Sequence, residues 1–421
     1  MSLLSRTRRR AALLAAAALV AGPALVAGPA VVVPTAAPAF AAEPCDASRV
    51  QLIPDRPYPL DRMGAQRVWQ RSTGAGVIVA VVDSGVDRRN PHLRGSVLPG
   101  VSLLPGDPDP RGWTDVIGHG TAVAGTIAAQ QLKGSGLLGL AHGARILPIR
   151  VFEAEADDQE ARARGWTPNA ARIAQGIRLA ADRGARVINV SMSQPQPDER
   201  LDAAVAYANS RGAVVVASGG NRNTAVDKRD TPRYPGASPG AVGVGAVDTN
   251  DNLSPDSIRG PHIDVLGVGA GVVTTYRDKG DCLIEGFDAS TSLATGYVSA
   301  AAALIAQVFP TATPEEIAYR LEASADRPVR GARDDGRGWG LVQPLDAITM
   351  TLDSARPGPP LPGTTPAPEP SVQTAAIDVR STPDPLAPQR ERAAWLLLGG
   401  GVAVALALLA GRWTVRRRMS G

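Results

Sequence analysis

Apolar and helical patterns alternate along the middle of the chain, from about Leu60 to about Met350. The run Val77 to Val82 is almost entirely β-branched, which is typical of a central parallel strand buried on both faces. Ala170 to Arg183 carries apolar residues at helical spacing and predicts an amphipathic helix. This alternation favours an α/β domain with a mostly parallel central sheet flanked by helices. Further strand-like runs lie at residues 145–151, 186–190, 213–217 and 242–247.

The pattern also marks where two helices begin or end. A long apolar helix is predicted over Thr291 to Val308, and the Phe309-Pro310 step ends it. Thr313 then provides the N-cap of the next helix, with Pro314 at its first position and Glu316 completing a capping box. By contrast, residues 153–165 are highly charged, and we expect a solvated surface loop there, the alternative being the rim of a binding cleft.

Residues 1–41 are typical of a secretory signal. Arginines between Arg6 and Arg10 precede the apolar run Ala11 to Ala21, and Ala39-Phe40-Ala41 supplies a small-x-small cleavage pattern. A retained N-terminal anchor is the alternative, because the apolar character continues past a normal signal core. Residues 42–59 follow as a short, extended segment that contains several prolines.

The other end of the chain predicts a membrane anchor. Residues 354–390 are rich in proline, threonine and alanine, which is typical of a semi-rigid linker. Residues 393–411 contain no charge and are long enough to cross a bilayer as a single helix. The basic tail, residues 412–421, is expected in the cytoplasm by the positive-inside rule, which places the α/β domain on the extracytoplasmic side of the cell membrane.

The basic character of the chain belongs to these two ends. The formal net charge of +4 includes eight arginines within residues 1–41 and 412–421, and removing them leaves −4 for residues 42–411. A nucleic-acid-binding function is therefore not supported. Cys45 and Cys282 are the only cysteines. In an exported chain they predict one disulfide, with two unpaired thiols as the alternative.

Three polar residues are candidates for nucleophilic catalysis. Asp83 closes the buried strand, His119 lies between two glycines at the start of a helical segment, and Ser292 lies at the start of the long apolar helix. A serine hydroxyl needs a base to take its proton, and a histidine base needs a carboxylate to fix its tautomer. The order Asp, His, Ser is a known order of this triad. The remaining histidines, His92, His142 and His262, are expected to be structural.

The words around these residues resemble the subtilase family over about Leu60 to Met350. They are Val-Val-Asp-Ser-Gly-Val-Asp at 81–87 and Gly-His-Gly-Thr-Ala-Val-Ala-Gly at 118–125. The resemblance implies a subtilisin-like fold and a serine endopeptidase, with Asn221 as the oxyanion donor. It also implies that the peptide substrate lies against two segments: Ser191, Met192 and Ser193, and Ser218, Gly219 and Gly220.

The word around the nucleophile departs from the family pattern. Ser290 replaces a glycine, and Gly296 replaces a proline within the helix. A glycine there weakens the helix by about 1 kcal/mol relative to alanine.

The overall plan resembles the mycosins, membrane-anchored peptidases associated with type VII secretion. The resemblance implies a membrane complex of that system as a partner. Two hypotheses follow: an extracytoplasmic endopeptidase that processes exported proteins, or a structural component with a weak or dispensable site. No cofactor or metal is expected, and Asp107, Asp109 and Asp115 are interpreted as a solvated acidic loop.

Overall fold

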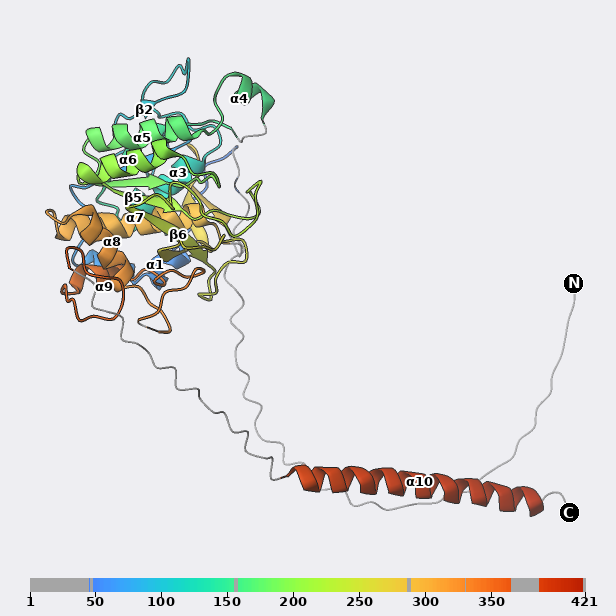
Figure 1. Cartoon of the computed structure of the whole chain (residues 1–421). Helices are drawn as coiled ribbons and strands as arrows, with labels where there is room; N and C mark the ends of the chain where they lie inside the picture. Colours follow the sequence, from blue (N-terminus) through green and yellow to red (C-terminus); the bar gives the residue numbers. More distant parts are fainter. Residues whose placement is uncertain are drawn as a thin grey trace, which may run out of the picture. The chain divides into compact units, whose positions relative to one another are not determined.

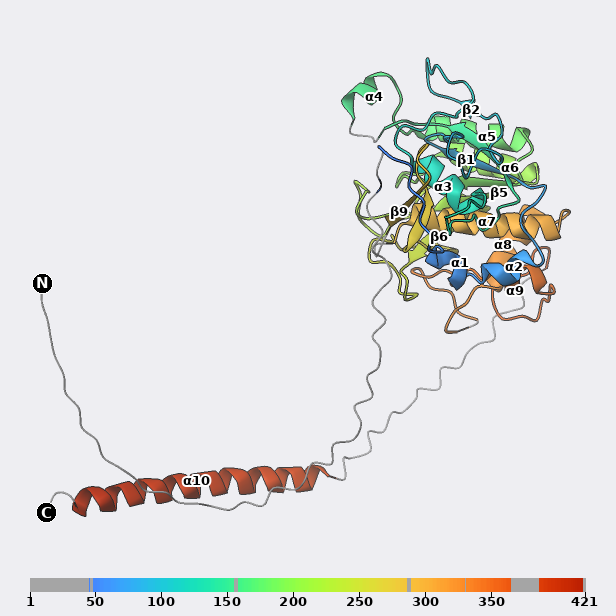
Figure 2. The same cartoon turned by 180° about the vertical axis from the view of Figure 1, so that it is seen from behind.

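The computed structural model describes residues 45, 48–154, 158–285, 289–329, 331–364 and 386–418. The chain divides into two compact units, residues 1–365 and 366–421. The first unit is built on a seven-stranded sheet in the order β2-β3-β1-β4-β5-β6-β7, in which every pairing is parallel. Figures 1 and 2 show the helices and strands of this unit from opposite sides. Its strands are β1 (Ile78–Asp83), β2 (Val101–Ser102), β3 (Arg145–Arg150), β4 (Val187–Val190), β5 (Val214–Ser218), β6 (Ala241–Val247) and β7 (Val265–Val268).

The central strands form because their residues can be buried on both faces. Every residue of β4, β5 and β7 is buried, and most of them are valine, leucine or isoleucine. β-Branched side chains pack well on a pleated surface, and a parallel sheet covered on both sides needs near-continuous apolar strands. The prediction of a mostly parallel α/β sheet is therefore confirmed.

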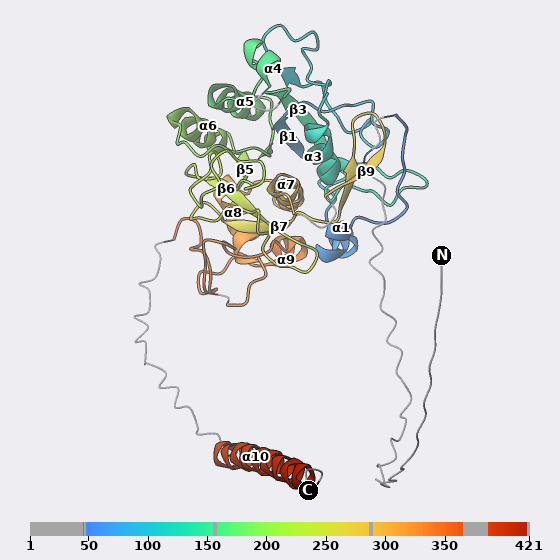
Figure 3. The same cartoon turned by 90° about the vertical axis from the view of Figure 1, so that its right-hand side faces the viewer.

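Helices cover the sheet on both faces (Figure 3). α5 and α6 pack on one face, and α3 and α7 pack on the other, with α8 and α9 lying against α7. Residues 291–306 of α7 are all buried, so this helix forms the centre of its layer. The helices of this unit are α1 (Tyr58–Arg62), α2 (Ala65–Trp69), α3 (His119–Ala128), α4 (Gln159–Ala163), α5 (Ala170–Asp182), α6 (Glu199–Ser210), α7 (Thr291–Val308), α8 (Pro314–Ala323) and α9 (Pro344–Thr349).

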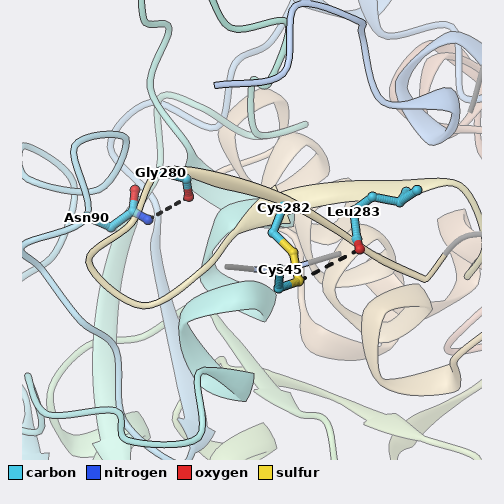
Figure 4. Close-up of a disulfide and its surroundings, with 5 residues drawn as sticks. All are labelled: Cys45, Asn90, Gly280, Cys282 and Leu283. Atoms are coloured by element: carbon cyan, nitrogen blue, oxygen red, sulfur yellow. Dashed lines mark hydrogen bonds between the residues drawn. A yellow bond between two sulfur atoms is a disulfide. The ribbon is translucent and has the colours of Figure 1, made fainter. Parts of the chain in front are cut away.

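The segment before α1 is fastened to a two-stranded antiparallel hairpin, β8 (Val272–Thr275) and β9 (Asp281–Glu285). A disulfide joins Cys45 to Cys282, with 5.2 Å between the two Cα atoms (Figure 4). Gln51 forms two backbone hydrogen bonds with the hairpin. Its amide donates to the Lys279 carbonyl, and its carbonyl accepts from the Asp281 amide, each at 2.9 Å. The prediction of a disulfide is confirmed, and the segment carries the sheet-like pairing of an extended chain.

The second unit contains α10 (Ala387–Arg418). An 18-residue window within residues 387–412 has a mean hydropathy of 2.2, and no part of this window is buried against protein. The helix is long and apolar enough to cross a membrane, and it begins six residues before the predicted span of 393–411. The predicted signal, residues 1–41, most of the predicted linker and the end of the basic tail lie outside the described residues.

Two local expectations need correction. Residues 153–165 are not simply a loop, because they include α4, whose N-cap Asp158 accepts from the amide of Ala161 at 2.9 Å. The capping box at α8 is only half formed: Thr313 accepts from the Glu316 amide, but the Glu316 carboxylate pairs with Arg320 at 2.9 Å instead of the N-cap amide. Arg320, one turn further along α8, takes the place of the backbone amide as the partner of that carboxylate.

Candidate active site

The three candidate residues stand at the ends of elements that pack together. Asp83 is the last residue of β1, His119 the first of α3, and Ser292 the second of α7. Crevices of parallel sheets form at the carboxyl ends of the strands, where Asp83 lies. α3 packs against both β1 and α7. It approaches β1 closely at Gly120, where a side chain would place its Cβ 2.1 Å from the Gly85 carbonyl oxygen.

Asp83 and His119 form a direct pair. Nδ1 of His119 lies 2.7 Å from Oδ1 of Asp83, and the carboxylate is fully buried while the imidazole is 34 % exposed. The same carboxylate oxygen accepts from the Ser84 amide at 2.7 Å. A carboxylate facing Nδ1 holds the proton there, which leaves Nε2 able to accept a proton from a nucleophile.

Asp115 supports this pair, although sequence reasoning assigned it to a solvated loop. It is buried, and its carboxylate accepts from the Thr121 hydroxyl at 2.6 Å, the Ser84 hydroxyl at 2.8 Å and the Gly118 amide at 2.9 Å. Burial raises its pKa despite these hydrogen bonds, and the charge of Asp83 adds to the rise. Asp115 thus ties the end of β1 to the start of α3.

Neither Asp107 nor Asp109 forms part of a metal site. Asp107 pairs with the buried Arg150 at 2.6 Å, so it is not solvated as expected. Burial alone would raise the pKa of Asp109, but hydrogen bonds from Arg111, Thr114 and Trp113 outweigh this effect. The pKa therefore lies below its ordinary value. Within the described ranges, no group of three or more histidine, cysteine or acidic side chains is arranged to hold a metal ion.

Ser292 is 9 % exposed and engaged on three sides. Its hydroxyl donates to the Ser191 carbonyl at 2.9 Å, its amide donates to the Ser290 hydroxyl at 3.3 Å, and its carbonyl accepts from the Ser191 hydroxyl at 2.8 Å. Ser290 is therefore the N-cap of α7, which gives this departure from the family pattern a structural role. A role as the nucleophile would require the Ser292 hydroxyl to release the Ser191 carbonyl.

Asn221 follows β5 and faces the start of α7. Its side-chain oxygen accepts from both the amide and the hydroxyl of Thr291, each at 2.9 Å. Since the oxygen is held in this way, the Nδ2 group is the part of the amide left to donate. This orientation suits the stabilisation of a developing negative charge beside Ser292.

The two segments expected to hold substrate lie next to each other. Ser191, Met192 and Ser193 follow β4, and Ser218 ends β5 with Gly219 and Gly220 after it. A Cβ at Gly220, whose φ is +93°, would lie 3.0 Å from the Ser193 hydroxyl. His262 lies 3.1 Å from the Gly219 carbonyl, and burial lowers its pKa. Peptide binding by these segments stays a prediction.

Two functional candidates were missed in the sequence. Ser299 donates to Asn189 at 2.9 Å, and Asn189 donates to the Ser191 hydroxyl, also at 2.9 Å. With the bond from Ser191 to Ser292, these contacts form a buried polar chain from the middle of α7 to its first turn. A polar residue inside the apolar strand at Asn189 was the one available signal, because buried polar groups need partners.

Gly296 also acquires a structural explanation. A Cβ at this position would lie 2.2 Å from the Thr126 hydroxyl oxygen, which is itself fixed by a hydrogen bond to the Val123 carbonyl at 2.8 Å. Thr126 lies in α3, two turns after His119. The glycine therefore lets the helices that carry His119 and Ser292 approach closely, a packing role that the weak helix propensity alone did not reveal.

A buried parallel sheet, an aspartate–histidine pair and a serine at a helix N-terminus define a serine hydrolase of the α/β class. Residues 74–340 match the model of the Subtilase family, and the chain belongs to that family. Thermitase of Thermoactinomyces vulgaris is 34 % identical over 273 residues, which cover 65 % of this chain and 89 % of thermitase.

Solved mycosin structures are also similar. MycP1 from the ESX-1 type VII secretion system has a TM-score of 0.61 at 28 % identity, covering 76 % of this chain and 92 % of that one. MycP3 protease from the type VII (ESX-3) secretion system has a TM-score of 0.60 at 30 % identity, covering 72 % and 92 %. The chain is thus a subtilisin-type serine endopeptidase with mycosins among its structural neighbours.

Proposed function

We propose that this chain is a membrane-anchored, extracytoplasmic endopeptidase that processes exported proteins and is associated with type VII secretion. The observation that carries the catalytic part is the 2.7 Å pair between His119 and the buried Asp83. This pair supports a role for Nε2 of the imidazole as the base that accepts the Ser292 proton. The similar structures of MycP1 and MycP3, which come from type VII secretion systems, support the link to secretion.

The proposed reaction proceeds in two halves. His119 removes the Ser292 proton as Oγ bonds to the scissile carbonyl carbon, and Nδ2 of Asn221 and the Ser292 amide donate to the resulting oxyanion. His119 then protonates the amine as the C–N bond breaks, which leaves an acyl-enzyme. A water molecule repeats the sequence and frees Ser292. The Ser292 amide must leave the Ser290 hydroxyl for this role.

The proposed topology is supported by two independent features. The Cys45–Cys282 disulfide is typical of a domain that folds in an oxidising compartment. α10 is apolar and exposed, and the basic tail that follows favours a cytoplasmic C-terminus. A single-pass protein with its peptidase unit outside the membrane satisfies both.

Covalent labelling with a fluorophosphonate tests the catalytic assignment. We expect the full chain in detergent to be labelled, Ser292→Ala to lose all labelling, and Ser324→Ala, a buried serine at the end of α8, to retain it. Equal labelling of wild type and Ser292→Ala would contradict the assignment. Loss of turnover in Asn221→Ala by roughly 10²–10³-fold, a magnitude known from subtilisin itself, would support the oxyanion role.

A second function, that of a structural component, is favoured by one specific observation. The Ser292 hydroxyl and amide are both satisfied within the protein, so the resting site must rearrange before it acts. Complementation of a deletion strain separates the two functions. Restoration of secretion by Ser292→Ala would assign the secretion role to the scaffold, whereas failure of a correctly inserted Ser292→Ala chain would assign it to proteolysis.

A further inference from the structure

The two sides of the candidate site differ in the chemistry that they present. His119 must protonate the departing amine, so the residues that follow the scissile bond lie on its side of the site. The residues that precede the bond are expected against the segments after β4 and β5. The β8–β9 hairpin and β5 lie on opposite sides of α7 in Figure 3. The hairpin therefore belongs to the leaving-group side.

The tip of this hairpin packs against Gly118, the residue before His119. A Cβ at Gly118 would lie 3.2 Å from Cγ of Arg277 and 3.3 Å from Cε2 of Tyr276. Arg277 thus approaches the residue that precedes His119 in the chain. The Arg277 guanidinium is 5.3 Å from the centre of the Tyr276 ring, and the stem of the arginine is partly buried.

Arg277 is not explained by the fold alone. Among the described residues it has no hydrogen-bonding or ionic partner, although its Nε atom is buried. Its φ is +44°, in the left-handed region where glycine is favoured over residues with a larger side chain. The Arg277 guanidinium, near the residue that precedes His119, is therefore available to a ligand.

A basic hollow lies near the hairpin turn, because the side-chain amide of Asn90, the neighbour of Arg89, donates to the Gly280 carbonyl at 2.8 Å (Figure 4). It has a volume of about 710 Å³ and is lined by Arg88, Arg89, Arg94 and Arg111, with Asp109 as its one carboxylate. Trp113 stands between Arg88 and Arg111, whose guanidinium carbons are 4.3 and 4.2 Å from its ring centre. Asp109 also accepts from the amides of residues 111, 113 and 114 and lies 3.9 Å from Arg111. Arg89 pairs with Asp87 at 2.6 Å, which leaves Arg88 and Arg94 as the arginines of the hollow that have no carboxylate partner among the described residues.

The hollow and the hairpin tip are electrostatically connected. Hydrogen bonding and the charge of Asp87 raise the pKa of Arg89, and the charge of Asp278, the neighbour of Arg277, contributes in the same direction. Asp87, which pairs with Arg89, is joined to α3, because its amide donates to the Thr121 hydroxyl at 2.9 Å. Arg277 and the four arginines of the hollow are called the arginine surface below.

We propose that the arginine surface selects substrates that carry acidic residues after the scissile bond. Arg277 engages a carboxylate close to the cut, and the hollow receives acidic side chains further along the leaving segment. Guanidinium groups suit this task because their fork of donors matches a carboxylate. The proposal rests on the proposed endopeptidase function and adds the substrate class to it.

Matched peptides test this selectivity with the full chain in lipid nanodiscs. A cleaved sequence is first found by digesting a proteome-derived peptide library, with Ser292→Ala as the blank. Two quenched fluorescent versions are then compared, one with Asp and Glu after the scissile bond and one with Asn and Gln. We expect the acidic peptide to be cleaved roughly tenfold better in kcat/KM, a ratio typical of a charged hydrogen bond, and the difference to lie in KM.

Arg277→Gln should remove most of that ratio by raising KM for the acidic peptide alone. Arg277→Gly should do the same while relieving the left-handed backbone, which separates loss of selectivity from loss of folding. Arg183→Gln, an exposed arginine at the end of α5, is the matched control and should leave the ratio unchanged. Raising the salt to about 1 M should also lower the ratio, since charges are then screened within about 3 Å.

Binding to the Ser292→Ala chain tests the surface without turnover. The acidic peptide should bind more tightly than the neutral one in fluorescence anisotropy, and Arg277→Gln should make the two equal. Equal affinities for the Ser292→Ala chain would overturn the proposal, whereas absence of Ser292-dependent cleavage would contradict only the endopeptidase function. Arginine-dependent adhesion to phosphatidylserine vesicles, with no peptide selectivity, would assign the surface to lipid headgroups and also overturn the proposal.

Discussion

Helices α7 and α10 are both long and apolar, yet they meet opposite surroundings. Thr291–Val308 has a mean hydropathy of 1.3 and is 89 % buried in protein, whereas an 18-residue window within Ala387–Arg412 has a mean hydropathy of 2.2 and is entirely exposed. α7 is covered by the sheet on one side and by α3, α8 and α9 on the others. The difference teaches that apolar length alone does not decide between core and membrane: the neighbouring elements do.

A charge placed in each helix should break this comparison most strongly. Leu304→Asp would bury an unpaired carboxylate in the centre of α7, and we expect a loss of about 4 kcal/mol or more in the free energy of unfolding. Leu406→Asp in α10 should leave the peptidase unit folded and reduce membrane insertion by about 3 kcal/mol. Thermal unfolding and membrane fractionation of both variants measure the two effects. Equal loss of folding would contradict the contrast.

An alanine at a glycine of each helix gives the next largest contrast. Gly296→Ala would force a Cβ to within 2.2 Å of the Thr126 oxygen, so α3 and α7 must separate, at a cost of about 1–3 kcal/mol. We also expect kcat to fall, because these helices carry His119 and Ser292. Gly400→Ala has no atom near the added methyl and should change neither quantity. A Gly296→Ala variant that is more stable than wild type would show that the helix propensity dominates.

The smallest expected effect is a dependence of stability on pH in α8, the helix that packs against α7. Burial, and then the charge of Asp264, raises the pKa of Glu322 in α8 to about 8. The folded state therefore binds a proton that the unfolded state releases near its ordinary value of 4.5, and stability falls as the pH rises from there towards 8. The carboxylate keeps some contact with solvent, so we expect roughly 1 kcal/mol across this window.

Glu322→Gln should flatten this decline and make the variant more stable than wild type near neutral pH. Glu315→Gln, an exposed residue in the first turn of the same helix, is the control. Chemical denaturation at several pH values provides the measurement. A decline of the same slope in the Glu322→Gln variant would assign the pH dependence to another group.

The sequence predicted the fold where one physical cause dominates. The β-branched run at Val77 to Val82 became β1, and the apolar run from Thr291 to Val308 became α7 with the predicted bounds. Both are decided by burial over many residues. The β8–β9 hairpin and its pairing with Gln51 escaped prediction, because their strands are short and their pairing depends on a disulfide and on distant residues.

The sequence motifs identified the Asp83–His119 pair, but they did not identify Asp115, which holds that pair in place. Asp83 and His119 are in contact as the triad requires, and the roles of Ser292 and Asn221 stay predictions. Asp115 was misjudged because an acidic residue among other acidic residues gives the composition of a solvated loop. Only the fold shows that the surrounding amides and hydroxyls of α3 converge on its carboxylate.

The Cys45–Cys282 bond has a further consequence for the covalent topology of the chain. It closes a ring that contains Asp83, His119 and Asn221, while Ser292 lies ten residues outside the ring, on the branch that continues to α10. A single cut within the ring therefore detaches nothing, and both fragments stay linked to α10 until the bond is reduced. A single cut in residues 365–385 instead releases the whole ring together with Ser292. The effect of a single cut on release from the membrane anchor therefore depends on whether it falls before or after Cys282.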